Sequence, residues 1–463
     1  MPRKRVTFIS PSPNNQRALP LRFDKIPAMR NRSRCWVVFA TAILLLARPG
    51  LSRDVEEKFD DGTVHLRYRT DAQDRKNGDY QEFFPGGKPH VRGTYTADKK
   101  SGTWTTFGDN GNPLEIAHYN NDQLDGPYQW NFPSGQPEMR GGYIHGSLAG
   151  AVTTFDEKGK LLFSLSYPIP WDNVLKAWNT WSPTDRPETK MAETPVATAP
   201  YKAGKIAPEC QQSALKYLML YRFLSGVPAE GMSIDADYVD RAQHGAVIIC
   251  HLGHLNHKPD KPDDMDEDFY KTAFAGTSQS NLAVGPRNLF SAIDMYMDDS
   301  DDSNIARVGH RQWMLNPGMQ KTGFGYCDKF SSLYAFDGSN HNNRNWLYIA
   351  YPGPGYYPHP MLNDHAAWSL SLNTQKCKVG NAGTIDIAVS ALDEHFAVTD
   401  TSTATIVAMP MSPNGGAWPC IVFKPEIKHP GVGKYVVSVT GIRTTTGAPA
   451  PLNYLVDVKQ MPR

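Results

Sequence analysis

A 24-residue repeat constrains this chain more than any other feature. Between residues 76 and 168, a glycine recurs every 24 residues; another glycine follows nine residues after each, and a tyrosine seventeen residues after each. The three series are Gly78, Gly102, Gly126 and Gly150; Gly87, Gly111, Gly135 and Gly159; and Tyr95, Tyr119, Tyr143 and Tyr167. Each unit predicts a strand, a glycine-containing turn and a second strand. Because one hairpin cannot bury its aromatic face alone, the units are expected to stack and share one core.

These units resemble MORN-type repeats, particularly the bacterial variant known as antitoxin repeats. The stretch "GTWTTFGDNGNPLEIAHY" carries the shared pattern: Gly-x-Tyr/Trp, a phenylalanine, a turn glycine and a later tyrosine. The resemblance implies a ribbon of β-hairpins over residues 53–168, with a spacing or binding role. We interpret the repeated glycines and tyrosines themselves as architectural.

The N-terminus has the composition of a targeting segment. Three arginines at positions 30, 32 and 34 precede the apolar run "CWVVFATAILLLA". This run fits the core of a secretory signal and is short for a membrane span, although a retained anchor is the competing interpretation. We expect residues 1–52 to be an N-terminal extension and signal peptide, with Met29 as a candidate start. The mature protein is then secreted or extracytoplasmic, with no stable transmembrane span.

Cleavage after Ser52 would leave five cysteines, an odd number that export permits to form disulfides. The pair Cys377 and Cys420 is the first candidate for an intrachain bridge, but the pattern leaves the connectivity open. The formal net charge is +1. No basic surface of the kind that binds nucleic acid is predicted.

The rest of the chain divides by pattern into three parts. Residues 169–207 are polar and rich in Pro, Thr and Ala, which predicts a linker. Residues 208–375 show helical periodicity near 208–224, 235–257 and 285–302, followed by strands. Residues 376–463 alternate like short strands between turns, which predicts a small all-β, immunoglobulin-like sandwich. The fold class is therefore multidomain.

Two histidines stand out among those of residues 208–375. His257 follows the second predicted helix, and His310 precedes a predicted strand in "VGHRQWMLNPGMQKTGFGY". Side chains at the ends of elements often face a cleft. With Asp299 nearby in sequence, the pair predicts either a site for zinc or another divalent cation or a general-base assembly. Ordinary polar surface is the competing interpretation.

Residues 208–372 resemble the CAP superfamily, the fold of cysteine-rich secretory proteins. The motifs, in order, are "LKYLMLYR", "AQHGA", "HKP", "SNLAVG", "AIDMYMDD" and "GHRQWMLNPGMQKTGFGY". The resemblance implies an α/β/α sandwich whose cleft holds two histidines and two acids, in some members with a divalent ion. His257, His310 and Asp299 match three of these positions, and Ser280 replaces the second acid. Ser280, Asn281 and Arg311 are expected to line the cleft, with Arg311 turned outward or ion-paired.

The resemblance and the patterns together favour a non-enzymatic binding or adhesion module. Its cleft would take a lipid, a peptide or a glycan from the cell surroundings. The alternative is a histidine-dependent hydrolase or peptidase, with or without a metal, that uses His257 and His310. The sequence contains no G-x-S-x-G nucleophile motif, which disfavours this alternative. A third interpretation is an envelope-building role with a vestigial cleft.

Overall fold

The structure is a computed structural model. It describes residues 51–183, 185–341, 345–363, 365–380, 382–409, 418–426 and 431–462. The predicted signal run and Met29 lie outside these described residues. Within the described part, no helix combines the length and apolar character that a membrane crossing requires.

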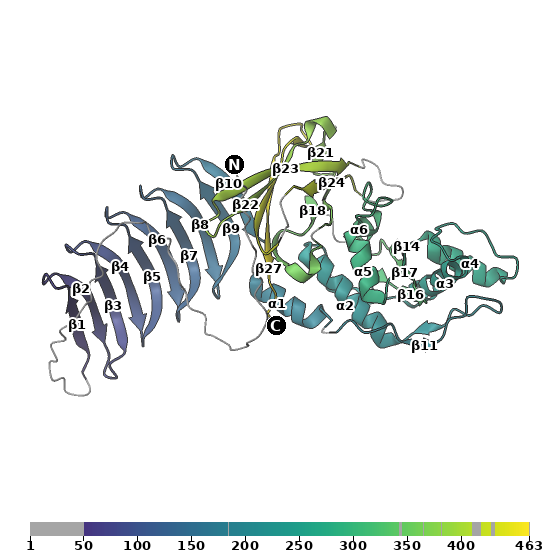
Figure 1. Cartoon of the computed structure of the whole chain (residues 1–463), viewed down its shortest axis with the longest axis horizontal. Helices are drawn as coiled ribbons and strands as arrows, with labels where there is room; N and C mark the ends of the chain where they lie inside the picture. Colours follow the sequence, from purple (N-terminus) through teal and green to yellow (C-terminus); the bar gives the residue numbers. More distant parts are fainter. Residues whose placement is uncertain are drawn as a thin grey trace, which may run out of the picture. The chain divides into compact units, whose positions relative to one another are not determined.

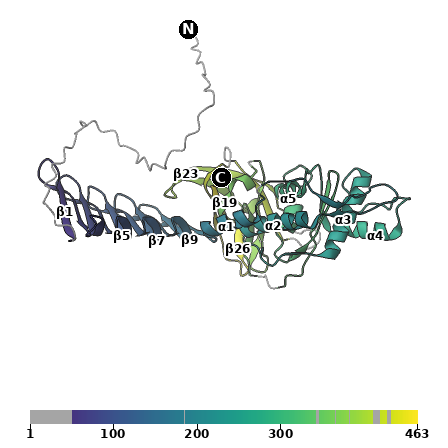
Figure 2. The ribbon, with the colours of Figure 1, turned by 90° about the horizontal axis from the view of Figure 1, so that it is seen from below.

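The first ten strands form one antiparallel sheet in which each strand pairs with the next along the chain (Figure 1). Seen from below, these strands form a single layer (Figure 2). This arrangement confirms the predicted hairpin ribbon. The strands are β1 Arg53–Lys58, β2 Val64–Thr70, β3 Lys76–Phe83, β4 Pro89–Thr96, β5 Lys99–Phe107, β6 Pro113–Asn120, β7 Gln123–Asn131, β8 Pro137–Ile144, β9 Ser147–Phe155 and β10 Leu161–Tyr167.

Neighbouring strands of the ribbon match a large residue with a small one. Tyr80 lies opposite Gly93, and Trp104 lies opposite Ala117. The indole of Trp104 also covers Gly93 so closely that a Cβ atom there would lie 2.2 Å from the ring. The ring of Tyr95 meets the same indole edge-on, with centroids 4.9 Å apart. Aromatic packing across strands therefore gives the single layer its core.

The last repeat is covered by strands from much later in the chain. The hydroxyl of Tyr167 donates to the buried Asp457 carboxylate at 2.7 Å. The hydroxyl of Tyr356 donates to the backbone carbonyl of Leu148 at 3.0 Å. These bonds join β9 and β10 to β19 (Gly355–Pro358) and β27 (Leu452–Lys459). The end of the ribbon is thus part of a larger apolar core.

The segment expected to be a polar linker has defined structure. It contains helix α1 (Trp171–Trp181), which buries Val174 and Ala177, and the strand pair β11 (Met191–Glu193) and β12 (Lys205–Ile206). Arg186 donates to the Asp294 carboxylate and, at 2.7 Å, to the hydroxyl of Tyr217. The prediction weighed the polar composition of this segment and overlooked its tryptophans and its partners on distant helices.

Helices pack on both faces of a three-stranded sheet in the next part of the chain. On strand β14, Leu282 packs against α3 and α4, while the adjacent Ala283 belongs to the core that includes α2 and α5. Adjacent strand residues point to opposite faces, so this alternation defines three layers. The helices are α2 Pro208–Leu224, α3 Ala236–Leu252, α4 Glu267–Ser278, α5 Leu289–Asp298 and α6 Gly309–Met314; the strands, in sheet order, are β14 Ser280–Val284, β17 Phe330–Tyr334 and β16 Phe324–Cys327. A short parallel pair, β13 (Ser233–Ile234) and β15 (Lys321–Thr322), lies beside them.

Two details of this part differ from the sequence prediction. Helix α4 was not predicted, although Asp266 caps it by accepting two backbone N–H groups. Residues 309–314 form helix α6 where a strand was expected, and the first strand after it is β15. The physical reason is a distant cap: the carboxylate of Asp299 accepts backbone N–H groups in the first turn of α6.

The C-terminal strands form one eight-stranded sheet, ordered β18-β20-β24-β23-β22-β25-β27-β19. The long strand β23 pairs with β22 through its first half and with β24 through its second half, so it joins the two halves of the sheet. Residues 348–372 belong to this sheet, so the boundary predicted at residue 376 falls inside it. The remaining strands are β18 Tyr348–Tyr351, β20 Trp368–Leu372, β22 Ile387–Leu392, β23 Val398–Ala408, β24 Cys420–Pro425 and β25 Gly433–Val439, with a separate pair β21 Cys377–Val379 and β26 Ile442–Thr444. The short 3-10 helices η1 (His359–Met361) and η2 (Ala382–Thr384) lie between strands.

All five cysteines of the described residues are free thiols. The predicted Cys377–Cys420 bridge is therefore wrong for this structure: the Cys377 thiol donates to the carbonyl of Asn373, and the Cys420 thiol to that of Ile421. The thiols of Cys250 and Cys327 instead contact each other, at the ends of α3 and β16. This contact, together with burial, raises the pKa of Cys327.

Candidate functional site

The backbone that leads to His310 adopts an unusual conformation at two positions. Asp299, just after α5, has φ of +46°, and Val308, just before α6, has φ of +42°. A β-branched residue such as valine rarely adopts a positive φ, and such strain of about 1–3 kcal/mol persists only where the surroundings enforce it. Val308 is fully buried. The packing around it therefore fixes the direction in which α6 and His310 leave the turn.

Asp299 holds His310 through both of its carboxylate oxygens. Oδ1 lies 2.8 Å from His310 Nδ1, and Oδ2 accepts the backbone N–H of His310 at 3.0 Å. The Asp299 side chain is fully buried, whereas 18% of the His310 side chain is exposed. Because the carboxylate accepts at Nδ1, the proton of a neutral imidazole sits there and Nε2 carries the free lone pair.

His257 is also held through its Nδ1 atom. Its Nδ1 lies 2.8 Å from the carbonyl oxygen of Thr277, the second-last residue of α4. A carbonyl only accepts, so Nδ1 donates and Nε2 again carries the lone pair. Although part of His257 is open to solvent, burial of the imidazole lowers its pKa, and the charge of His310 lowers it further.

The three residues expected to line the cleft are all buried, each with 2% or less of its surface exposed. Asn281 donates from its amide to the backbone carbonyl of His310 at 3.0 Å, so it positions α6. The guanidinium of Arg311 binds the backbone carbonyls of Met297 and Ala367, at 2.6 and 2.8 Å. The expectation of an outward or ion-paired Arg311 is wrong, because these carbonyls satisfy it in the interior. The hydroxyl of Ser280 has no hydrogen-bond partner among the described residues.

The expected metal ligands do not fit a metal centre. Both carboxylate oxygens of Asp299 accept hydrogen bonds from His310, one from Nδ1 and one from the backbone N–H, so neither lies at Nε2. Ser280 has a hydroxyl and supplies no carboxylate. Catalytic zinc sites generally have three protein ligands. Across the described ranges, no group of three or more His, Cys, Asp or Glu side chains is arranged to hold a metal ion. In this structure, His257 and His310 are two separately held imidazoles, and Asp299 is the carboxylate that positions His310.

Two further residues of the site were not predicted. Thr277 orients His257 through its carbonyl, and a backbone carbonyl leaves no sequence signal. Tyr296 lies with its ring centroid 5.4 Å from that of His310. Its hydroxyl lies 3.1 Å from the carbonyl of Asn281 and 3.2 Å from that of Ser331, so it ties α5 to the sheet. Its place in the "AIDMYMDD" motif was the available signal.

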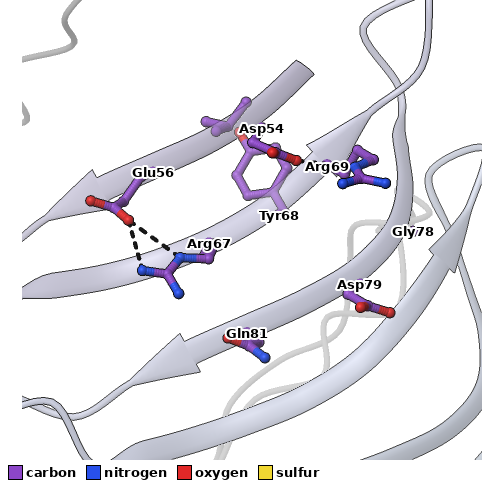
Figure 3. Close-up of a pocket in the computed structure, with 9 residues that line it drawn as sticks. Asp54, Glu56, Arg67, Tyr68, Arg69, Gly78, Asp79 and Gln81 are labelled. Atoms are coloured by element: carbon purple, nitrogen blue, oxygen red, sulfur yellow. Dashed lines mark hydrogen bonds and ion pairs between the residues drawn. The ribbon is translucent and has the colours of Figure 1, made fainter. Parts of the chain in front are cut away.

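A separate hollow of about 590 Å³ lies on the ribbon, over strands β1 to β3 (Figure 3). Arg67 donates to Glu56 at 2.9 Å, and Arg69 donates to Asp54 at 3.0 Å. Paired charges of this kind protect the outer strands of a sheet from pairing with other chains. We therefore interpret the hollow as a solvated face of the first hairpins.

Comparison with known families supports the repeat. Residues 100–121 match the MORN repeat variant family, which agrees with the pattern of the second repeat unit. The comparison with curated proteins finds no match.

Three solved structures show limited similarity to this chain. The first is a glycosylation-associated protein complex from Streptococcus agalactiae, at 16% identity and a TM-score of 0.17; the match covers 30% of this chain and 25% of that chain. The second is an extracellular protein containing a SCP domain from Bacillus anthracis, at 14% identity and a TM-score of 0.21; the match covers 55% of this chain and 84% of that chain. The third is a cysteine-rich secretory protein from Staphylococcus aureus, at 12% identity and a TM-score of 0.18; the match covers 62% of this chain and 80% of that chain. This chain thus spans about a quarter of the first of these structures. TM-scores of this size describe no shared global fold, so the function proposed below depends on the sequence motifs and on the geometry of this chain.

Proposed function

We propose that this chain is an exported, CAP-like binding protein whose ligand contacts His257 and His310. The observation that carries the proposal is that both imidazoles are fixed through Nδ1. Each ring thereby offers its Nε2 lone pair as a hydrogen-bond acceptor. Ligand groups that donate hydrogen bonds suit such a pair: peptide amides, glycan hydroxyls or the polar headgroup of a lipid. The ribbon would act as a spacer or as a second adhesive surface.

Binding is tested with the full chain on immobilised peptides, glycans and phospholipid vesicles. We expect one class to bind, with affinity reduced about tenfold or more in both His257→Ala and His310→Ala, because each removes the Nε2 acceptor. His254→Ala is the matched control, since His254 is exposed beyond the end of α3 and, among the described residues, its ring hydrogen-bonds to the nearby carbonyl of Leu252 alone. Equal affinity in all three variants would contradict the proposal.

Export is tested independently of binding. The arginines and the apolar run before residue 52 support it. Fractionation of cells that express the full chain is expected to place a shortened protein outside the cytoplasm. A full-length protein that stays in the cytoplasm would contradict export and leave the binding proposal standing.

One observation favours a second candidate, a hydrolase. An imidazole held by a buried carboxylate is an arrangement that general-base catalysis uses, and Asp299 holds His310 in this way. The test is turnover on a panel of esters and peptides. Turnover that is lost in His310→Ala and strongly reduced in Asp299→Asn would replace the binding proposal with this one.

A further inference from the structure

A second pocket, of about 290 Å³, lies where the loop after α6 meets the C-terminal sheet. None of the residues of the histidine site lines it. Its lining residues share one property, which is that none of the eight is charged. They are Asn316, Pro317, Gly318, Asn340, Trp346, Asn373, Gln375 and Trp418.

Two tryptophans form the aromatic part of the pocket. Trp346, before β18, and Trp418, before β24, meet edge-on at 82°, with ring centroids 4.9 Å apart. The indole Nε1 of Trp418 is buried and has no hydrogen-bond partner among the described residues. A buried N–H group without a partner is costly, so a ligand acceptor that reaches this N–H would gain a hydrogen bond.

Side-chain amides form the polar part. Asn373 is 1% exposed and rigid: its amide donates to the carbonyl of Trp346 at 2.9 Å and its oxygen accepts the backbone N–H of Gln375 at 3.0 Å. The side chain of Gln375 is exposed and makes no hydrogen bond within the described part of the chain. An amide offers both donors and acceptors, which match a hydroxyl group in either role.

From this juxtaposition we infer that the pocket binds a neutral saccharide of one or two rings. Indole faces suit the apolar C–H faces of a sugar ring, and uncharged amides suit its hydroxyls. The volume of about 290 Å³ lies just below the range for ligand pockets, about 300–1,000 Å³, which limits the ligand to a small one. The lack of a lining charge disfavours phosphorylated or acidic ligands, since nothing in the pocket would neutralise them.

The inference is tested by titrating the full chain with cellobiose, maltose and N,N′-diacetylchitobiose, followed by tryptophan fluorescence and calorimetry. We expect at least one to bind with a Kd of about 0.1–1 mM. Glucuronate, which is acidic, should bind more weakly than glucose. Failure of all three disaccharides and of glucose, or a preference for glucuronate, would overturn the inference.

Three variants locate the binding. Trp418→Phe keeps an aromatic ring but removes the N–H donor, so we expect about fivefold weaker binding. Gln375→Ala changes an exposed side chain that makes no hydrogen bond to the described residues, and about a threefold loss is expected. Trp130→Phe, on strand β7 of the ribbon, is the control and should leave the affinity unchanged. If neither pocket variant weakens binding while the control also has no effect, the saccharide binds elsewhere and the inference fails. The histidine variants test the proposed function separately, because they do not touch this pocket.

Discussion

The two ends of the ribbon use the same repeat for different surroundings. One position of successive units holds Lys76, Lys100, Leu124 and Leu148. At the first end, the Lys76 ammonium lies 5.0 to 5.2 Å from three tyrosine rings, and the Lys100 ammonium lies 4.4 Å from the ring of Trp104. At the other end, Leu148 is only 6% exposed, and Val152 replaces the aromatic residue of its unit.

The difference shows how a repeat can end without a separate capping domain. A cation over an aromatic ring keeps its charge in water while its stem covers the ring. A leucine at the same position carries no charge, so the later strands β19 and β27 can pack over this end of the ribbon instead. The exchange of lysine for leucine, with Val152 in place of an aromatic residue, thus distinguishes the docked hairpin from the solvated ones.

The sharpest way to break this comparison is to exchange the two residue types. Leu148→Lys places an ammonium where 6% of the residue is exposed. We expect it to lower the free energy of unfolding by about 3 kcal/mol, because a buried charge without a partner is strongly unfavourable. The reverse exchange, Lys100→Leu, should change stability by about 1 kcal/mol or less. Urea unfolding of both variants measures the difference, and equal effects would show that the two ends are not distinct.

A smaller effect is expected from the close approach in the ribbon core. Gly93→Ala would bring a Cβ atom to 2.2 Å from the Trp104 ring, so the indole must move. We expect a loss of about 1–3 kcal/mol in the free energy of unfolding, as for other overpacked cores. Gly142→Ala is the matched control, since the nearest atom to its Cβ would be 3.8 Å away. A similar loss in both variants would point to strand flexibility and not to the indole.

The smallest expected effect concerns pH at the docked end. Burial raises the pKa of Asp457, although Lys459, Lys434 and the Tyr167 hydroxyl oppose the shift. A carboxyl whose pKa is raised on folding contributes stability below its unfolded pKa and loses it as the pH rises through the folded pKa.

Asp457→Asn should therefore flatten the pH dependence of unfolding in the window that begins at about pH 4, the ordinary pKa of an aspartate, and ends at the raised folded pKa. At the upper end of this window the variant should be more stable than the wild type, by on the order of 1 kcal/mol. Urea unfolding across the window measures both effects. A wild type that gains stability with rising pH relative to the variant would contradict the raised pKa.

The predictability of each region follows from how far apart its contacting residues lie. The ribbon could be predicted because its strands pair with their neighbours: Gly78 lies opposite Tyr95, seventeen residues away. The two histidines were found from motifs, and the structure adds how each ring is held. Residues 348–372 were grouped with the helices of segment 208–375 because β20 pairs with β24, about fifty residues later, and no local pattern records that partner.

Helices α6 and α4 illustrate two different reasons for a wrong or missing prediction. The cap of α6 comes from Asp299, ten residues before its first residue, so the local sequence lacks a start signal. The cap of α4 is local: Asp266 is followed by Glu267 and Asp268 in the first turn, a recognisable helix start. The start of α6 could not be predicted from neighbouring residues, because its cap lies ten residues away. The start signal of α4 was present in the local sequence and was overlooked.

The 24-residue period gives the ribbon a length that changes only in fixed steps. One unit contributes two strands, and strands are spaced about 4.8 Å apart, so each added or deleted unit shifts the far hairpin by roughly 10 Å. Because the docked unit contacts later strands through its own residues, such a change upstream leaves that junction intact. A gene encoding this architecture can therefore adjust the reach of its first hairpins by duplication alone.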